Sequence, residues 1–88
     1  MVTIATDKRV LNYKEAKAKF DGHWFLMDQR DFPPEEDKGY VVAYGDGTAE
    51  DREALRKINF DKYHGEVFLL KGYMQKDEIF DSGIIEIV

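Results

Sequence analysis

Three short apolar runs constrain the fold of this chain more than any other feature. They are "HWFLMD" at residues 23–28, "GYVVAY" at 39–44 and "EVFLLK" at 66–71. Each is shorter than a core helix, is rich in aromatic and aliphatic residues and is bounded by glycine or charged residues, a pattern typical of buried strands. The segment "IIEIV" at 84–88 alternates apolar residues with Glu86 and is predicted to form a fourth strand with one solvated face.

Two further segments have the pattern of capped helices. The first begins after Asn12, a predicted N-cap, and Glu15 stands three residues later, where it completes a capping box. The second follows the Gly-Asp-Gly turn at 45–47, with Thr48 as the predicted cap and Asp51 as an aspartate version of the capping-box partner. The first helix precedes the strands, and the second separates the second strand from the third.

These elements predict one α+β domain over residues 1–88, in the order α-β-β-α-β-β, because 88 residues support a single small core. We expect a mixed sheet of about four strands, since a helix between the second and third strands permits their parallel pairing through a crossover. Both helices are expected on one face, giving two layers. Residues 1–11 are expected to form an extended N-terminal arm, and residues 72–83 a long excursion before the last strand.

Composition restricts the classes of partner. The formal net charge of −5 disfavours adhesion to phosphate backbones and anionic membranes, so direct nucleic-acid or membrane binding is not expected. The absence of cysteine excludes disulfides and thiolate metal sites. The sequence has neither a signal-peptide pattern nor an apolar run of membrane-spanning length, which favours a cytoplasmic protein. A protein of phage or plasmid origin would have the same features.

One basic cluster contrasts with this acidic balance. A solvated helix face is the simpler interpretation of it, and binding of an anionic partner is the alternative. The cluster consists of Lys8, Arg9, Lys14, Lys17 and Lys19.

The Gly-Asp-Gly turn at 45–47 is similar to half of a dinucleotide-binding fingerprint, because a strand, two glycines and a helix start follow one another. Asp46, Glu50 and Asp51, however, place carboxylates where a pyrophosphate would lie. Like charges about 4 Å apart repel by about 4 kcal/mol at an effective dielectric of about 20, which exceeds the attraction of a helix terminus. We interpret the segment as a structural turn, with weak cation binding by the three carboxylates as the alternative.

No motif indicates catalysis or a cofactor. His23 and His64 lack the spacing of a metal site, and Ser82 lies in an Asp-Ser-Gly turn without the features of an activated nucleophile. We expect no catalytic, cofactor or metal residues.

Two segments carry side chains that the predicted fold does not explain, and they form the candidate interaction surface. One is the apolar part of the excursion at 72–83, and the other is the acidic Pro-Pro loop between the first two strands, where Phe32 either covers the core edge or takes part in recognition. The residues of this surface are Tyr73, Met74, Ile79, Phe80, Phe32, Glu35, Glu36 and Asp37.

The order of helix, "GHWFLMD", loop, "GYVVAYGDG", helix and "GEVFLLKG" resembles a family of small uncharacterised bacterial domains of unknown function. In that family a Gly-x-Trp strand, a Val-Val-Ala-x-Gly strand and a helix precede a third strand. The resemblance covers about residues 13–71 and depends on Gly22, Trp24, Val41, Val42, Ala43 and Gly45. The Pro-Pro loop and the tail after Lys71 depart from it, so it implies the fold and carries no site residues.

The leading functional hypothesis is a non-catalytic accessory or regulatory module that binds a protein, either another copy of itself or a different partner. The alternative is an acidic binder or mimic that acts on a nucleic-acid-handling protein. The third hypothesis is a small metal-dependent or acid-base enzyme, which needs clustered carboxylates with His23 or His64.

Overall fold

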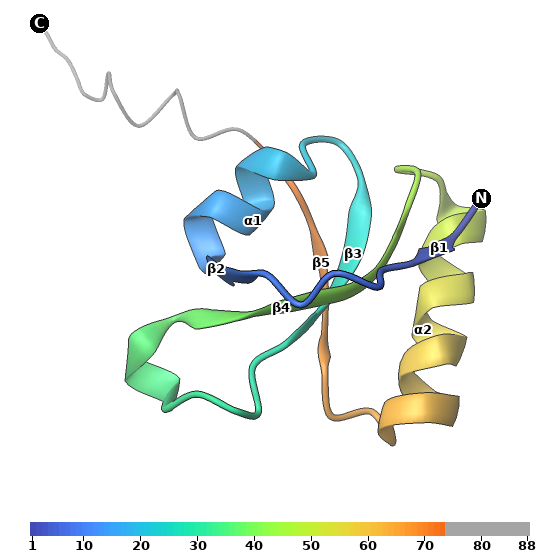
Figure 1. Ribbon diagram of the computed structural model, residues 1–88. Helices are drawn as coiled ribbons and strands as arrows, with labels where there is room; N and C mark the ends of the chain where they lie inside the picture. The colour runs from blue at the N-terminus through green and yellow to red at the C-terminus, as the bar shows by residue number, and fades with distance from the viewer. Residues whose placement is uncertain (74–88) are drawn as a thin grey trace, which may run out of the picture.

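The structure, a computed structural model, describes residues 1–73 and consists of an antiparallel sheet and two α-helices (Figure 1). The strands are β1 (Thr3–Ile4), β2 (Val10–Asn12), β3 (Trp24–Asp28), β4 (Lys38–Gly45) and β5 (Phe68–Lys71). The helices are α1 (Tyr13–Lys19) and α2 (Ala49–Tyr63), and a short 3-10 helix, η1 (Pro34–Glu36), precedes β4. The α+β class is confirmed. The predicted strand at 84–88 and residues 74–83 of the excursion lie outside the described residues.

The sheet differs from the prediction in strand number and direction. Its order within residues 1–73 is β1-β4-β3-β5, with β2 also paired to β4, and every ladder between these strands is antiparallel. The helical connection from β4 to β5 does join two strands that run in the same direction. They do not pair, because β3 lies between them and is antiparallel to both. The prediction of a mixed sheet of about four strands was therefore wrong for the described part of the chain.

The N-terminal residues account for the extra strands. β1 pairs with the second half of β4 and β2 with its first half, so the segment expected as an arm lies along one edge of the sheet (Figure 1). Between them the backbone N–H of Ala5 donates to the carbonyl of Val42 at 3.0 Å. A two-residue and a three-residue strand are too short to give a recognisable alternation in the sequence.

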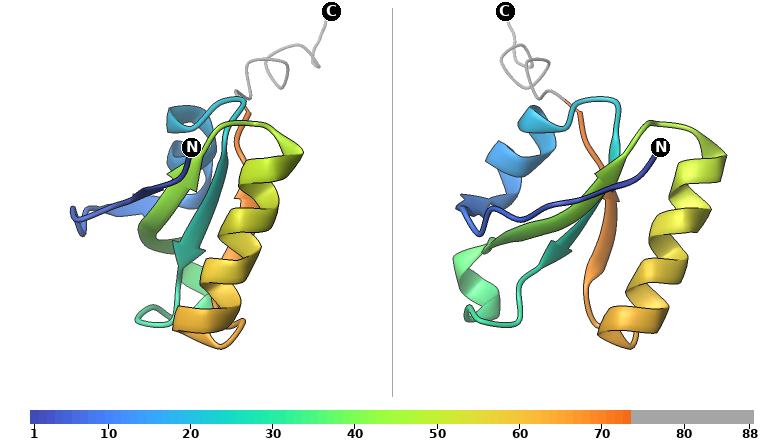
Figure 2. Two further views of the ribbon diagram at one scale, coloured as in Figure 1. Left: turned by 90° about the vertical axis from the view of Figure 1, so that its right-hand side faces the viewer. Right: turned by 45° about the vertical axis from the view of Figure 1, so that its right-hand side comes forward.

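The two helices cover opposite faces of the sheet, which gives three layers instead of the expected two (Figure 2). On one face Ala16 of α1 packs with Phe25, Met27 and Val41, and on the other Leu55 of α2 packs with Leu26 and its neighbours. Successive strand side chains point to opposite faces. A run of consecutive apolar residues, such as the first four residues of β3, therefore needs cover on both sides.

A β-bulge in β4 determines which residues of this strand face each of the two cores. Leu26 pairs with Ala43 whereas Met27 pairs with Val41, so Val42 is the extra residue. Val41 and Ala43 would share a face in a regular strand, but the bulge places Val41 in the α1 core and Ala43 in the α2 core.

In the described part of the chain, no helix is both long enough and apolar enough to span a bilayer.

Candidate interaction surface

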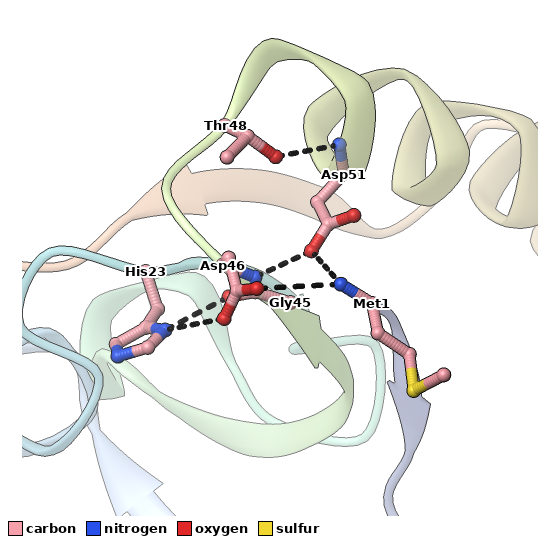
Figure 3. A network of polar contacts seen from close by, with 6 residues as sticks. All are labelled: Met1, His23, Gly45, Asp46, Thr48 and Asp51. Atoms are coloured by element: carbon pink, nitrogen blue, oxygen red, sulfur yellow. Dashed lines mark hydrogen bonds and ion pairs between the residues drawn. The ribbon is translucent and has the colours of Figure 1, made fainter.

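The Gly-Asp-Gly turn is a structural junction in which the polar groups bind one another (Figure 3). Thr48 caps α2 as predicted, because its hydroxyl accepts from the backbone N–H of Asp51 at 3.2 Å. Asp51 does not complete the predicted capping box. Its Oδ2 accepts instead from the backbone N–H of Asp46 and from the Met1 ammonium, both at 2.7 Å. The long-range donor Met1 and the nearby N–H of Asp46 replace the capping-box partner.

The two carboxylates of this junction are held by one cation of the fold, the Met1 ammonium. Asp51 is only 5% exposed, and its ion pair with the Met1 ammonium, helped by the Asp46 N–H, holds the pKa of its carboxyl below the ordinary value. Hydrogen bonds to Asp51 and then to Asp46 raise the pKa of the Met1 amine. The carboxylate of Asp46 also lies 3.3 Å from that amine. A phosphate at this turn would have to compete with these bonds and would meet both carboxylates.

The turn also packs closely against the chain segment between α1 and β3. A Cβ added to Gly47 would collide with the carbonyl oxygen of Gly22. His23 donates from Nδ1 to the carbonyl of Gly45 at 3.1 Å, and the same nitrogen lies 3.9 Å from the Asp46 carboxylate. Gly47 is thus required for close backbone approach.

Within residues 1–73, the residues considered for metal binding do not form a group that could hold a metal ion. No three histidine, aspartate or glutamate side chains among residues 1–73 lie close enough to hold a metal ion. His64 is the C-cap residue of α2, where its backbone adopts the left-handed conformation with φ of 56°. His23 instead contacts the Gly-Asp-Gly turn. Asp46 and Asp51 contact the Met1 ammonium, while Glu50 is exposed in the first turn of α2.

The Pro-Pro loop borders a pocket of about 500 Å³, which we call the loop pocket. The ring of Phe32 is half-buried and lies against Tyr40, with 5.5 Å between the ring centroids. The two prolines are exposed, and Phe68 at the start of β5 is 54% exposed. The pocket is lined by Gln29, Arg30, Phe32, Pro33, Pro34, Asp37, Glu66 and Phe68.

The rim of the loop pocket is acidic. The one arginine, Arg30, is engaged by Asp28 at 2.9 Å and by Glu66 at 3.1 Å, and its hydrogen bonds lower the pKa of the Asp28 carboxyl. Glu35, Glu36 and Asp37 are exposed and form no ion pair within the described residues. Their negative charge is therefore not neutralised by an ion pair in this part of the chain, although the exposed Lys38 follows Asp37.

The predicted surface does not form one patch. Phe32 and Asp37 line the loop pocket and Glu35 and Glu36 lie beside it in η1, whereas Tyr73 lies beyond the opposite end of β5, ~16 Å from Phe68 at 3.3 Å per residue. The Tyr73 hydroxyl accepts from Lys17 Nζ at 3.0 Å. Met74, Ile79 and Phe80 are outside the described residues.

Sequence reasoning did not identify Phe68, Arg30 or Glu66 as part of this surface. The available signal was the position of Phe68 at the start of an apolar strand, with its side chain on the face opposite Val67 and Leu69. Its exposure depends on which strand lies at the edge, which is a long-range property.

No protein-family model matches the chain, and comparisons with curated proteins and with solved structures give no match.

Proposed function

We propose that this chain is a small cytoplasmic, non-catalytic module that binds a partner protein at the loop pocket, and that the partner contributes a basic segment with one large apolar side chain. The observation that carries the proposal is the combination of an exposed Phe68 with acids that form no ion pair within residues 1–73: Asp37 in the lining of the same pocket, and Glu35 and Glu36 beside it. Such a combination suits an apolar anchor surrounded by charged contacts.

The apolar part of the pocket supplies the anchor site. Pro33 and Pro34 have fixed φ angles, and Phe32 is held by its contact with Tyr40, so little conformational freedom is lost when a partner binds. Burial of one large apolar side chain against these groups and Phe68 contributes about 1.5–3 kcal/mol. That is a moderate contribution, consistent with a reversible complex.

The charged rim of the loop pocket determines which partner segments can bind. Because Arg30 is already paired, the field at the rim is negative, and a basic segment is attracted while an acidic one is repelled. Exposed charges are screened by salt over about 8 Å at physiological ionic strength. Binding should therefore weaken as salt is added.

Isothermal titration with a synthetic peptide tests the proposal. The probe is a short peptide in which lysines and arginines flank one tryptophan, and its control has glutamate in place of every basic residue. The Glu35→Gln/Glu36→Gln/Asp37→Asn variant should weaken binding about tenfold or more, and Phe68→Ala should weaken it by a similar factor. The matched control is Glu50→Gln/Glu53→Gln/Asp61→Asn, which removes the same charge from α2.

Equal loss of binding in the matched control would show that only net charge matters and would contradict a specific site. Equal affinity for the basic and acidic peptides would contradict it as well, as would unchanged affinity in Phe68→Ala.

A second candidate is that the partner is a nucleic-acid-handling protein whose basic surface is occupied by the chain. The three consecutive exposed acids at 35–37 favour it, because a run of carboxylates can take the place of backbone phosphates. The test is a competition in which the chain displaces duplex DNA from a basic-region peptide. Displacement that survives neutralisation of residues 35–37 would contradict this candidate.

A further inference from the structure

A second pocket, of about 450 Å³, lies between the N-terminal strands and the end of α1, over β4, and we call it the arm pocket. Its apolar lining includes Leu11, Phe20, Val41 and Tyr44, all of which belong to or pack against the α1 core. The rings of Phe20 and Tyr44 are 5.1 Å apart between centroids. The pocket is thus an aromatic and aliphatic recess on the α1 side of the sheet.

The short first helix explains why this recess is open. α1 has seven residues and is ~10 Å long, whereas β4 has eight residues and is ~26 Å long. The helix cannot cover the length of the strand beneath it. The N-terminal segment lies along the edge of β4 (Figures 1 and 2). Its residues from Thr3 to Asp7 line the other side of the pocket.

Two cations stand on the rim of the arm pocket. Arg9 and Lys19 both line it, both are exposed, and neither forms an ion pair within residues 1–73. Asp7, the one acid in the lining, is likewise without an ion pair in this part of the chain. Two cations therefore face one carboxylate at the rim, and neither cation is held in an ion pair within residues 1–73.

We propose that the arm pocket binds a small organic monocarboxylate with a flat, apolar body. The body would lie against Phe20, Tyr44 and Val41, where apolar burial and ring contacts favour it. The carboxylate would receive charge-assisted hydrogen bonds from Arg9 and Lys19. Asp7 on the same rim opposes a multiply charged ligand, which distinguishes this site from a phosphate or nucleic-acid site. The proposal is independent of the loop pocket.

The experiment is a titration of the ¹⁵N-labelled chain with 2-naphthoate and, as a neutral ligand of the same shape, 2-naphthamide. Naphthoate should shift the amide signals of residues 3–11, 19, 20, 41 and 44, and its affinity should exceed that of naphthamide by about tenfold. Arg9→Gln/Lys19→Gln should remove most of that preference, and Asp7→Asn should increase the affinity for naphthoate a few-fold. Lys57→Gln/Lys62→Gln on α2 is the matched control and should bind naphthoate as the unmodified chain does.

Each of the opposite outcomes overturns the proposal. Equal affinity for the two ligands would show an apolar recess without charge recognition. Equal weakening in the α2 control would show a non-specific charge effect. Shifts confined to the loop pocket, or no shift at the solubility limit of naphthoate, would show that the ligand does not enter the arm pocket.

Discussion

The starts of the two helices have similar sequence signals but different structures. At α1, Asn12 and Glu15 form a reciprocal capping box, with bonds of 2.7 and 3.1 Å, and both residues are exposed. At α2, Thr48 makes its half of the box, but Asp51 is buried and binds Met1 and Asp46. The cap of α1 faces solvent, and both bonds of its capping box form between residues three apart. The carboxylate of Asp51 is buried and accepts stronger hydrogen bonds from donors outside α2, one of which is charged.

The capping box of α1 is a local interaction, whereas the hydrogen bonds of Asp51 are tertiary interactions. The α1 box stabilises only the first turn of a seven-residue helix. The Asp51 network joins the N-terminus, the Gly-Asp-Gly turn and α2 (Figure 3). Changes at the start of α2 should therefore affect the whole fold more than equivalent changes at the start of α1.

The largest effect is expected for Gly47→Ala. The added methyl group meets the carbonyl oxygen of Gly22, a backbone atom that cannot rotate away, and we expect a loss of about 1–3 kcal/mol in the free energy of unfolding. Chemical denaturation measures the loss, and the amide signals of Gly22 and His23 should shift. A stability equal to that of the unmodified chain would show that the turn can move away from β3 freely.

The next effect is expected for Asp51→Asn, because the amide cannot accept as strongly from the Met1 ammonium and the Asp46 N–H. We expect the Tm to fall by roughly 8 °C. Glu15→Gln is the matched change at α1, and a Gln can keep the capping-box bond, so its Tm should change by less than about 2 °C. Similar changes in the two variants would remove the distinction between a local and a tertiary helix start.

These two helix starts also show what the sequence could predict. Asn12, Glu15 and Thr48 were identified as caps because their partners lie within three residues. The partner of Asp51 was not, because Met1 lies 50 residues away and no local pattern marks it. Local spacing determines local bonds, and a long-range ion pair becomes visible only when the tertiary contacts are known.

The same limit applies to the sheet and to the interaction surface. The runs at 23–28 and 39–44 were predicted as strands, and β3 and β4 coincide with them to within one residue. The order of the strands depends on pairing between distant segments, so the antiparallel β3–β5 ladder and the short N-terminal strands were missed. Phe32 and the acids at 35–37 were proposed as interaction residues because prolines and charges mark a loop, and the structure places Phe32 and Asp37 in the lining of the loop pocket. Phe68 was missed because its exposure depends on that strand order.

A smaller effect is expected when each capping side chain is removed. Thr48→Ala and Asn12→Ala each leave the N–H of the third helical residue without its acceptor, which costs about 1 kcal/mol at a typical N-cap. The loss should be larger at Thr48, because α2 carries Leu55 into a core and contributes to the packing of β3, β4 and β5. Denaturant midpoints of the two variants give the comparison. A larger loss at Asn12 would indicate that α1 contributes more to the cooperative core than α2 does.

The smallest effect is a pH dependence that belongs to α2 alone. The folded pKa of Asp51 lies below its ordinary value of 3.8, so its contribution to stability is complete above that value and is lost as the pH falls through the folded pKa. The folded pKa of the Met1 amine lies above 8.0, so its contribution is complete below pH 8.0 and is lost as the pH rises through the folded pKa.

The Tm difference between the unmodified chain and Asp51→Asn should therefore be constant between about pH 5 and 8 and should decrease by a few degrees on either side. The corresponding Tm difference between the unmodified chain and Glu15→Gln should not change on the alkaline side, because the start of α1 has no contact with the Met1 amine. An alkaline decrease of the same size in that difference would mean that the amine acts through overall charge and not through its bond to Asp51.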